Sequence, residues 1–286
     1  TIKPDYLDAL CLRGGVLLSS FKRPQEAIAD LEKVLAIKPD REYALGMLAD
    51  AKMHCANWDN RKEESARIAG GVRGGKKSVL PFSFLAMSDS AADQIQCARI
   101  WVRDNCPPAP TPIWRGERYR HERIRVAYLS ADFHEHPVAH LLAGLFELHD
   151  RSRFECTAIS FGPDIASEMR TRVKSAFERF IDVHNKSDLE VANLLRQLEI
   201  DIAVDLMGFT ANSRTGIFAL RAAPVQVNYL GYPGTLGADY IDYILADRVV
   251  IPEDLRVHYA EKVVYVAETF QANDFKSRTA GRTPTR

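Results

Sequence analysis

Short apolar runs alternate with amphipathic helical patterns throughout residues 123–273. A strand that is followed by a helix pairs in parallel with the next strand, so that helices cover both faces of one sheet. The sequence therefore predicts an α/β, Rossmann-like layer in this region. Strands are expected at 124–129, 155–161, 200–207, 225–229, 241–245 and 262–266, with helices at 138–149, 167–177, 189–198 and 213–220.

Residues 1–69 follow a purely helical pattern instead. Pro4-Asp5 and Pro39-Asp40 stand 35 residues apart, and the helix that ends before Pro39 carries one apolar face, formed by Ala27, Leu31 and Val34. These offsets resemble the second helix of a tetratricopeptide repeat, and an ordinary helical hairpin is the alternative. Residues 43–54 begin a second repeat, whose partner helix is expected to degenerate after Trp58. The region is predicted to be all-α and tetratricopeptide-like.

Residues 70–122 are predicted to be a helical linker. Gly70–Lys77 reads GGVRGGKK; it lacks the residue order of a phosphate-binding loop and follows no strand, so a flexible basic break is expected. Pro81–Cys106 predicts one or two helices, and the proline-rich run 107–112 predicts a stiff connector. At the other end of the chain, residues 274–286 lose all apolar periodicity and are predicted to be disordered.

The overall composition excludes some classes of function. The 38 basic and 38 acidic residues give a net charge of zero, which argues against electrostatic binding to nucleic acids or membrane surfaces. No apolar run approaches the roughly 18 residues of a spanning helix. The five cysteines are scattered and show no CxxC spacing, so reduced thiols in a cytoplasmic protein are expected. The chain begins inside a helical pattern and is expected to be a fragment at that end.

The motif AYLSADFHEHPVAH places a polar turn directly after the first predicted strand. Ligands bind at the carboxyl ends of strands in open α/β sheets, so this turn is a candidate site. His134, His136 and His140 lie near Asp132, which suggests a metal site, but a fourth ligand is not evident. A helix-capping turn before Pro137 is a second interpretation. We favour a third, in which His136 acts in acid–base chemistry or sugar binding and Asp132 orients it.

Two further motifs follow strands. In LGYPGTLG, after VQVNY, a glycine-rich turn lets backbone N–H groups approach polar oxygens, although an ordinary turn is the alternative. In DLMGFT, the residues Asp205, Gly208 and Thr210 are candidates to line the same cleft, although Asp205 is also suited to capping the loop. No GxSxG motif, Walker loop or Cys–His pair is present, so acyl transfer and nucleotide hydrolysis fit poorly.

Together these segments resemble the catalytic region of the intracellular protein O-GlcNAc transferases, including the bacterial homologues and the plant SPINDLY-like branch. The matching stretches keep their order across residues 123–273; they are RIRVAYLSADFHEHPVAHLLAGLFELHDRSRFE, LEIDIAVDLMGFT, FALRAAPVQVNYLGYPGTLGADYIDYILAD and EKVVYV. The upstream repeats agree, because this family carries such arrays before its catalytic region. The resemblance implies a glycosyltransferase B-type fold, of which residues 123–273 are the first Rossmann-like half.

The resemblance also implies a reaction: transfer of GlcNAc from UDP-GlcNAc to Ser or Thr hydroxyls of proteins, with inversion and without a metal or another cofactor. It implies that His136 lies beside the reacting sugar, with Asp132 in support. Either His136 or the donor phosphate is then a candidate to take the proton of the acceptor hydroxyl. It implies donor-sugar contacts from Pro137 and from the loop formed by Leu230, Gly231, Tyr232, Pro233, Gly234 and Thr235. Protein acceptors are expected to bind the helical repeats, and no nucleic acid or membrane partner is expected.

One departure from the family pattern concerns the second Rossmann half, which holds the nucleotide and is not evident after residue 273. We therefore expect this chain alone to bind the donor weakly and to turn over little or not at all. Two alternative functions remain open. One is protein O-fucosyl transfer, as in the SPINDLY-like branch, and the other is a non-catalytic module whose repeats bind partner proteins.

Overall fold

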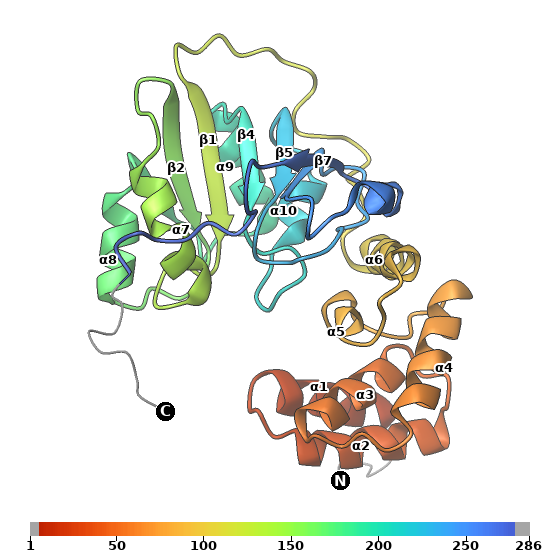
Figure 1. Cartoon of the computed structure of the whole chain (residues 1–286). Helices are drawn as coiled ribbons and strands as arrows, with labels where there is room; N and C mark the ends of the chain where they lie inside the picture. The colour runs from red at the N-terminus through yellow and green to blue at the C-terminus, as the bar shows by residue number, and fades with distance from the viewer. Residues whose placement is uncertain (1–5, 278–286) are drawn as a thin grey trace, which may run out of the picture. The chain divides into compact units, whose positions relative to one another are not determined.

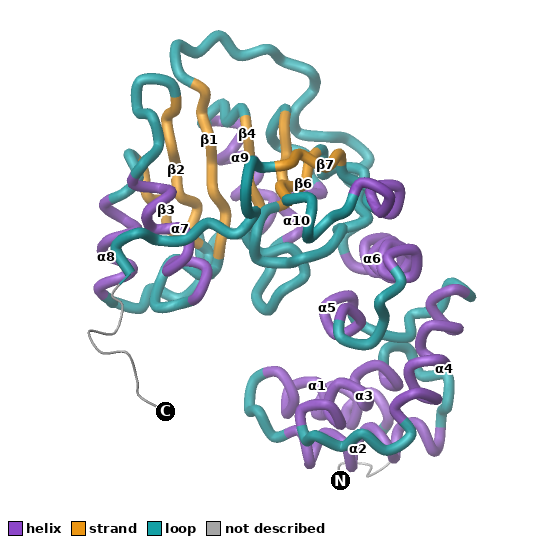
Figure 2. The backbone as a smooth tube through the Cα atoms, viewed as in Figure 1, coloured by secondary structure: helices purple, strands orange, loops and turns teal. Residues whose placement is uncertain are grey.

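The computed structural model describes residues 6–277 of the 286. The chain forms two compact units, one of Thr1–Pro107, Gly234–Ala238 and Val257–Ala260, the other of Pro108–Pro233, Asp239–Arg256 and Glu261–Arg286. The first unit is helical and the second holds the sheet (Figures 1 and 2). Within residues 6–277, no helix combines the length and the apolar character that crossing a membrane requires.

The helical unit begins with the two predicted repeat helices. Its helices are α1 (Leu7–Ser19), α2 (Pro24–Ile37), α3 (Ala44–His54), α4 (Arg61–Arg73), α5 (Pro81–Leu85) and α6 (Ala91–Asn105). The apolar face predicted for α2 is fully buried, in a cluster with side chains of α1 and α3. Leu31 on α2 and Leu48 on α3 belong to this cluster, so the first three helices share one core.

α4 corrects two predictions. It is the partner helix that was expected to degenerate after Trp58, and it also runs through Gly70 and Gly71, where a flexible break was expected. Periodicity does not reveal this helix because its buried side chains are few, Ile68 and Val72. Arg73 in its last turn donates hydrogen bonds to both carboxylate oxygens of Asp93 on α6, at 2.6 to 3.1 Å. Tertiary contacts therefore outweigh the low helix propensity of glycine.

α5 and α6 lie within the segment that was predicted to be helical. Side chains of both helices are buried against α4, in a cluster that holds Ile68, Phe84, Cys97 and Ile100. Residues up to Pro107 therefore belong to the helical unit, whereas a separate linker was expected from residue 70. The division between the two units, after Pro107, lies inside the proline-rich run.

The second unit is built on a seven-stranded, fully parallel sheet in the order β3-β2-β1-β4-β5-β6-β7. Its strands are β1 (Ile124–Ser130), β2 (Phe154–Ser160), β3 (Arg179–Asp182), β4 (Ile202–Asp205), β5 (Val225–Asn228), β6 (Tyr243–Ala246) and β7 (Lys262–Tyr265). The predicted α/β, Rossmann-like class is confirmed. β3, a four-residue edge strand, was not predicted, because its sequence RFID has only two apolar side chains between two charged ones.

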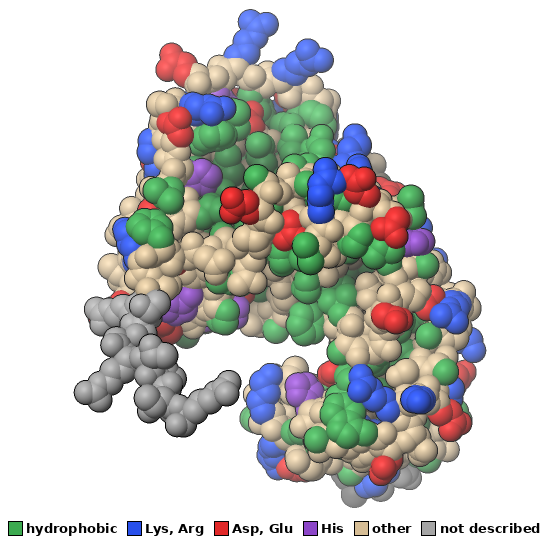
Figure 3. All heavy atoms as spheres, viewed as in Figure 1, with side chains coloured by type: hydrophobic (Ala, Val, Ile, Leu, Met, Phe, Trp, Pro, Cys, Tyr) green, Lys and Arg blue, Asp and Glu red, His purple; other side chains and the backbone are tan. Residues whose placement is uncertain are grey.

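Helices cover the two faces of the sheet unequally. α7 (Pro137–Glu147) and α8 (Glu168–Ser175) lie on one face, and α9 (Asp188–Gln197) and α10 (Thr215–Ala219) lie on the other (Figure 1). Beneath α7, Tyr128 of the interior strand β1 packs edge-on against Phe146, with 5.1 Å between the ring centroids. Farther along the same face, β4 to β6 carry half-buried apolar side chains: Ile202, Val225, Tyr243 and Leu245. Figure 3, drawn from the same side as Figure 1, shows hydrophobic side chains at the surface of the sheet unit.

Residues 267–277, which we call the strap, pass from β7 to α8 (Figure 1). The Tyr229 hydroxyl donates to the Phe270 carbonyl at 2.7 Å, and Arg172 of α8 donates to both oxygens of Asp274 at 2.6 and 2.9 Å. Asp274 is only 9% exposed. The predicted disorder is therefore wrong for residues 274–277, and residues 278–286 lie outside the described residues.

Gly46 tests the packing of the helical unit. A β-carbon at Gly46 on α3 would lie 2.6 Å from Val79 Cα and 2.7 Å from the Ser78 carbonyl oxygen. We expect Gly46→Ala to lower the free energy of unfolding by about 1–3 kcal/mol, because the neighbouring backbone has to move. Gly70→Ala is the matched helical control, since nothing lies within 4 Å of a β-carbon there. It should raise stability by about 0.5–1 kcal/mol in the same urea titration. Equal effects of the two substitutions would contradict this packing.

Candidate active site

The interior strand β1 ends at Ser130, and the polar turn that follows it leads directly into α7. Pro137 occupies the first helical position, where a missing N–H is harmless, and His136 is the N-cap in an extended backbone conformation. Phe133 anchors the turn from inside, because its side chain is fully buried against Phe146, Phe177 and Phe180. The turn thus holds its polar residues at the carboxyl edge of the sheet, where functional groups of open α/β folds lie.

Asp132 lies between two imidazoles of this turn. Its Oδ2 is 3.5 Å from His136 Nδ1, and its Oδ1 is 4.0 Å from His134 Nε2. The third histidine of the motif is engaged elsewhere, because His140 Nε2 lies 2.6 Å from Glu135 Oε1. Among residues 6–277, no group of three or more His, Cys, Asp or Glu side chains is arranged to hold a metal ion. The arrangement is that of a carboxylate that orients histidines.

Two partners compete for Nδ1 of His136. The Val138 N–H donates to it at 3.3 Å and so caps α7, which requires a lone pair on Nδ1 and, in the neutral ring, the proton on Nε2. Asp132 favours the other tautomer, with the proton on Nδ1 and the lone pair on Nε2. Only this second tautomer lets Nε2 accept a proton. Asp132 therefore favours the tautomer in which Nε2 is basic, and the helix cap from Val138 favours the other.

Burial also changes the proton affinity of Asp132. Its side chain is 14% exposed, and this desolvation raises the pKa of the carboxyl, while His136 and His134 act in the opposite direction. A carboxylate with a raised pKa is a stronger proton acceptor than an exposed aspartate. Asp132 is therefore suited to share a proton with His136.

Asp205 ends β4, next to β1, and is paired in register with Leu129. Its Oδ1 accepts hydrogen bonds from the N–H groups of Met207 at 2.8 Å and Gly208 at 3.1 Å, so the side chain caps the turn that follows. Its Oδ2 is buried without a hydrogen-bond partner among the described residues. Burial raises the pKa of Asp205 to about 6. Thr210 completes the turn by donating from Oγ1 to the Met207 carbonyl at 3.0 Å.

The glycine-rich loop begins at the carboxyl end of β5, two strands from β1. Leu230 has a positive φ of 68°, and a β-carbon on Gly231 would lie 2.0 Å from the Leu206 carbonyl oxygen. Tyr232 packs edge-on against Phe209, with 5.2 Å between ring centroids. The loop is therefore held tightly to the turn after β4. Gly234 and Thr235 belong to the helical unit, where Thr235 Oγ1 accepts from the N–H of Ala260 at 3.2 Å.

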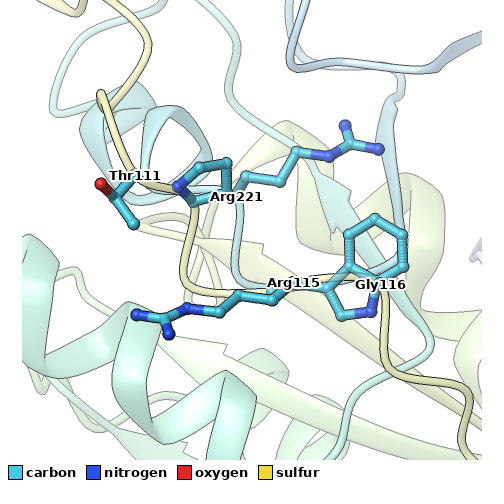
Figure 4. Close-up of a pocket in the computed structure, with 6 residues that line it drawn as sticks. Thr111, Arg115, Gly116 and Arg221 are labelled. Carbon is cyan, nitrogen blue, oxygen red and sulfur yellow. The ribbon is translucent and has the colours of Figure 1, made fainter.

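A shallow pocket of about 640 Å³ lies away from this edge, beside residues 219–221, which precede β5. Trp114 and Arg221 line it; Arg115 and Arg221 extend away from each other there (Figure 4). The guanidinium of Arg221 donates to the Tyr240 and Pro224 carbonyls and to Asp242, at 2.8 to 3.1 Å. Arg221 thus serves the fold, and the pocket adds no group to the candidate site.

The model of glycosyl transferase family 41 matches residues 111–280, which is more than half of the chain. The chain belongs to glycosyl transferase family 41. Two similar proteins carry related names: the probable UDP-N-acetylglucosamine–peptide N-acetylglucosaminyltransferase SEC of Arabidopsis thaliana and the UDP-N-acetylglucosamine–peptide N-acetylglucosaminyltransferase of Caenorhabditis elegans. The first is 33% identical over 77% of this chain and the second 35% identical over 57%.

The family-41 chain spans only part of these relatives, 24% of the Arabidopsis protein and 15% of the C. elegans protein. A rice relative named SPINDLY is 30% identical over 55% of the chain. Among solved structures, the K341M mutant of the Thermobaculum terrenum O-GlcNAc transferase matches with a TM-score of 0.56. This match has 24% identity and covers 95% of this chain and 59% of the other. The glycosyltransferase class that the sequence predicted is confirmed.

The fold brings together part of the predicted site. Asp132, His136 and Pro137 share one turn, and the residues around Asp205 and Gly231 lie at the same edge of the sheet. His140 is turned toward Glu135, as expected for a histidine outside the site. Sequence reasoning missed Arg170, a buried arginine of α8 that donates to the Phe133 carbonyl in the first turn. No motif marks it, because its partners come from three separate strand ends.

Asp205 predicts a pH-dependent stability for this family-41 chain. Its pKa is raised in the folded state, so the folded state holds the proton more tightly and loses stability as the pH rises through that pKa. A rise from 3.8 to about 6 corresponds to about 3 kcal/mol. We expect the unfolding free energy of the wild type, relative to Asp205→Asn, to fall by up to that amount between about pH 4 and about pH 7. Urea titrations at several pH values measure this, and a pH-independent difference would contradict it.

Proposed function

We propose that this chain contributes the donor-sugar side of a protein O-GlcNAc transferase, which transfers GlcNAc from UDP-GlcNAc to Ser or Thr hydroxyls with inversion. One observation carries the proposal: the Asp132 carboxylate lies 3.5 Å from Nδ1 of His136 at the carboxyl end of β1, which suits the two side chains to accept a proton together. The names of the SEC and C. elegans relatives support the choice of donor and acceptor. UDP-GlcNAc enters as a substrate, and the proposal names no cofactor.

The proposed step moves one proton and one sugar. The acceptor hydroxyl gives its proton to Nε2 of His136 while its oxygen bonds to the anomeric carbon, and the bond from that carbon to the diphosphate oxygen breaks. UDP leaves with the bonding electron pair. Asp132 stabilises the imidazolium that forms, because its carboxylate faces Nδ1. The raised pKa of Asp132 suits it to share this proton.

The glycine-rich loop after β5 is proposed to contact the donor sugar. Its tight approach to the Leu206 carbonyl holds Gly231 and Tyr232 at the same sheet edge as His136. A backbone held so closely presents its N–H groups without reorganising when a ligand arrives. Pro137 is proposed to contact the sugar from the side of the first turn, because it directly follows His136.

The helical unit is proposed to bind the protein acceptor. A groove of about 600 Å³ opens there, and its lining includes Leu12, Val16, Met47 and Trp101 beside the charged residues Lys22 and Asp50. Tyr43 and Trp101 form an edge-on aromatic pair in this groove, with 5.6 Å between ring centroids. Such a mixture suits an extended polypeptide with apolar and polar side chains. The five free cysteines favour a cytoplasmic setting for this encounter.

Saturation-transfer NMR of the chain with nucleotide sugars tests the choice of donor. We expect weak, saturable binding of UDP-GlcNAc, with the strongest transfer to its sugar protons, and less transfer to GDP-fucose. The sheet edge offers groups for the sugar, in Asp132, His136 and the loop at Gly231. Stronger transfer to GDP-fucose would favour the fucosyl alternative. No binding of either donor would favour the interaction module.

His136→Ala tests the proposed base. The variant is placed in a chimaera in which residues 123–273 replace the matching segment of the Thermobaculum transferase. Since a positioned general base contributes about a hundredfold or more, kcat should fall by at least about that factor, with little change in KM for UDP-GlcNAc. His140→Ala is the control, because His140 is paired with Glu135 and about half exposed. Unchanged kcat in His136→Ala would refute the assignment.

A further inference from the structure

Arg170 is a buried cation that the proposed reaction step does not use. It lies on α8 and is only 7% exposed. Its Nη1 donates to the Phe133 carbonyl at 3.2 Å and to Ser160 Oγ at 3.3 Å. Its Nη2 donates to Asp182 Oδ2 at 3.1 Å and pairs with Asp164 Oδ1 at 2.8 Å. One guanidinium thus joins the turn after β1 to the ends of β2 and β3.

The Phe133 carbonyl lies in the middle of the turn that carries Asp132 and His136. Two hydrogen bonds lie within the turn: the Asp132 N–H donates to Ser130 Oγ, and the His134 N–H donates to the Asp132 carbonyl. At the start of the turn, the Ala131 N–H donates to Met207 Sδ at 3.4 Å. The two bonds within the turn close it but do not orient it, so its orientation depends on tertiary contacts such as the buried Phe133 ring. Arg170 supplies a tertiary hydrogen bond, and a charged donor makes this bond stronger than a neutral one.

We propose that Arg170 is a positioning residue, which holds the turn so that the Asp132 carboxylate and the His136 imidazole face each other. The inference rests on the proposed function, since the position of this pair affects catalysis only if His136 is the base. It extends that function, because it identifies the residue that keeps the Asp132 carboxylate next to the His136 imidazole. Arg170 itself contacts neither Asp132 nor His136 through any hydrogen bond of the described chain.

The shape of the guanidinium explains why arginine occupies this position. Its donors point in fixed, planar directions, so it reaches the Phe133 carbonyl, Ser160 and Asp182 at once, which a lysine ammonium on a flexible stem does not. Its two carboxylate partners remain accessible to solvent, with side-chain exposures of 73% for Asp164 and 32% for Asp182. Removal of the guanidinium therefore leaves neither carboxylate buried and unpaired, and the variants below are expected to fold.

Amide hydrogen exchange of the 286-residue chain, followed by NMR, reports the turn directly. In Arg170→Gln and Arg170→Lys, we expect the His134 and Val138 amides to exchange roughly five- to tenfold faster, since loss of one hydrogen bond changes local opening by about that factor. The imidazole ¹⁵N shifts of His136 should also move, because the balance between its two competing partners at Nδ1, Val138 and Asp132, changes with the position of the turn. Amides of α9 should be unaffected in both variants.

Arg172→Gln is the matched control, two residues away on the same helix. Arg172 binds Glu147 and Asp274 and makes no hydrogen bond to the turn, so its loss should leave the His134 and Val138 amides and the His136 shifts unchanged. The proposal is overturned if folded Arg170→Lys keeps wild-type exchange at these amides. It is equally overturned if Arg172→Gln speeds them as much, since a general loosening of α8 then explains both results.

These readouts need no donor and no turnover. Failure of the donor-binding experiment would therefore contradict the proposed function and leave the positioning role of Arg170 standing as a property of the turn. Conversely, wild-type exchange in both Arg170 variants would remove the positioning role, and the proposed function would still rest on Asp132 and His136.

Discussion

The parallel hydrogen bonds that join β1 to β2 and β4 determine where the candidate functional groups of the sheet unit lie. β1 pairs along its whole length with β2 and over Val126–Leu129 with β4. Since all the strands run in the same direction, the turns that follow β1, β4 and β5 reach one edge of the sheet. Residues far apart in sequence, such as Asp132 and Asp205, therefore lie at the same edge of the sheet.

That edge is also where the sheet buries polar groups. Asp205 is buried with one carboxylate oxygen bound to two backbone N–H groups, and the other has no hydrogen-bond partner within residues 6–277. Asp132 is largely desolvated. Buried polar groups are costly unless satisfied, so their presence here points to a role beyond packing. Arg170 offsets part of the cost of burying polar groups. Its single buried guanidinium donates to acceptors at three strand ends and is paired with two accessible carboxylates.

The parts of the fold that were predicted from sequence share a physical basis. β1 and β2 are seven-residue strands whose last five residues are buried, so their apolar runs are unmistakable. β3 has only two apolar side chains, in the sequence RFID, and α4 buries little beyond Ile68 and Val72, so neither leaves a clear apolar pattern. The strap is held by Arg172 and Asp274, which are 102 residues apart, and no local pattern reports such an ion pair.

The sequence by itself determined the α/β class, the family, and the turn that carries Asp132 and His136, because strand periodicity and the His-Pro helix start are local properties of the chain. Only the tertiary structure decided how Asp132 lies between His134 and His136, which oxygen of Asp205 lacks a partner among the described residues, and which arginine donates to the turn. Those outcomes depend on the distances between side chains of separate segments and on how deeply the sheet buries them. The spacing of residues along the chain reports neither quantity.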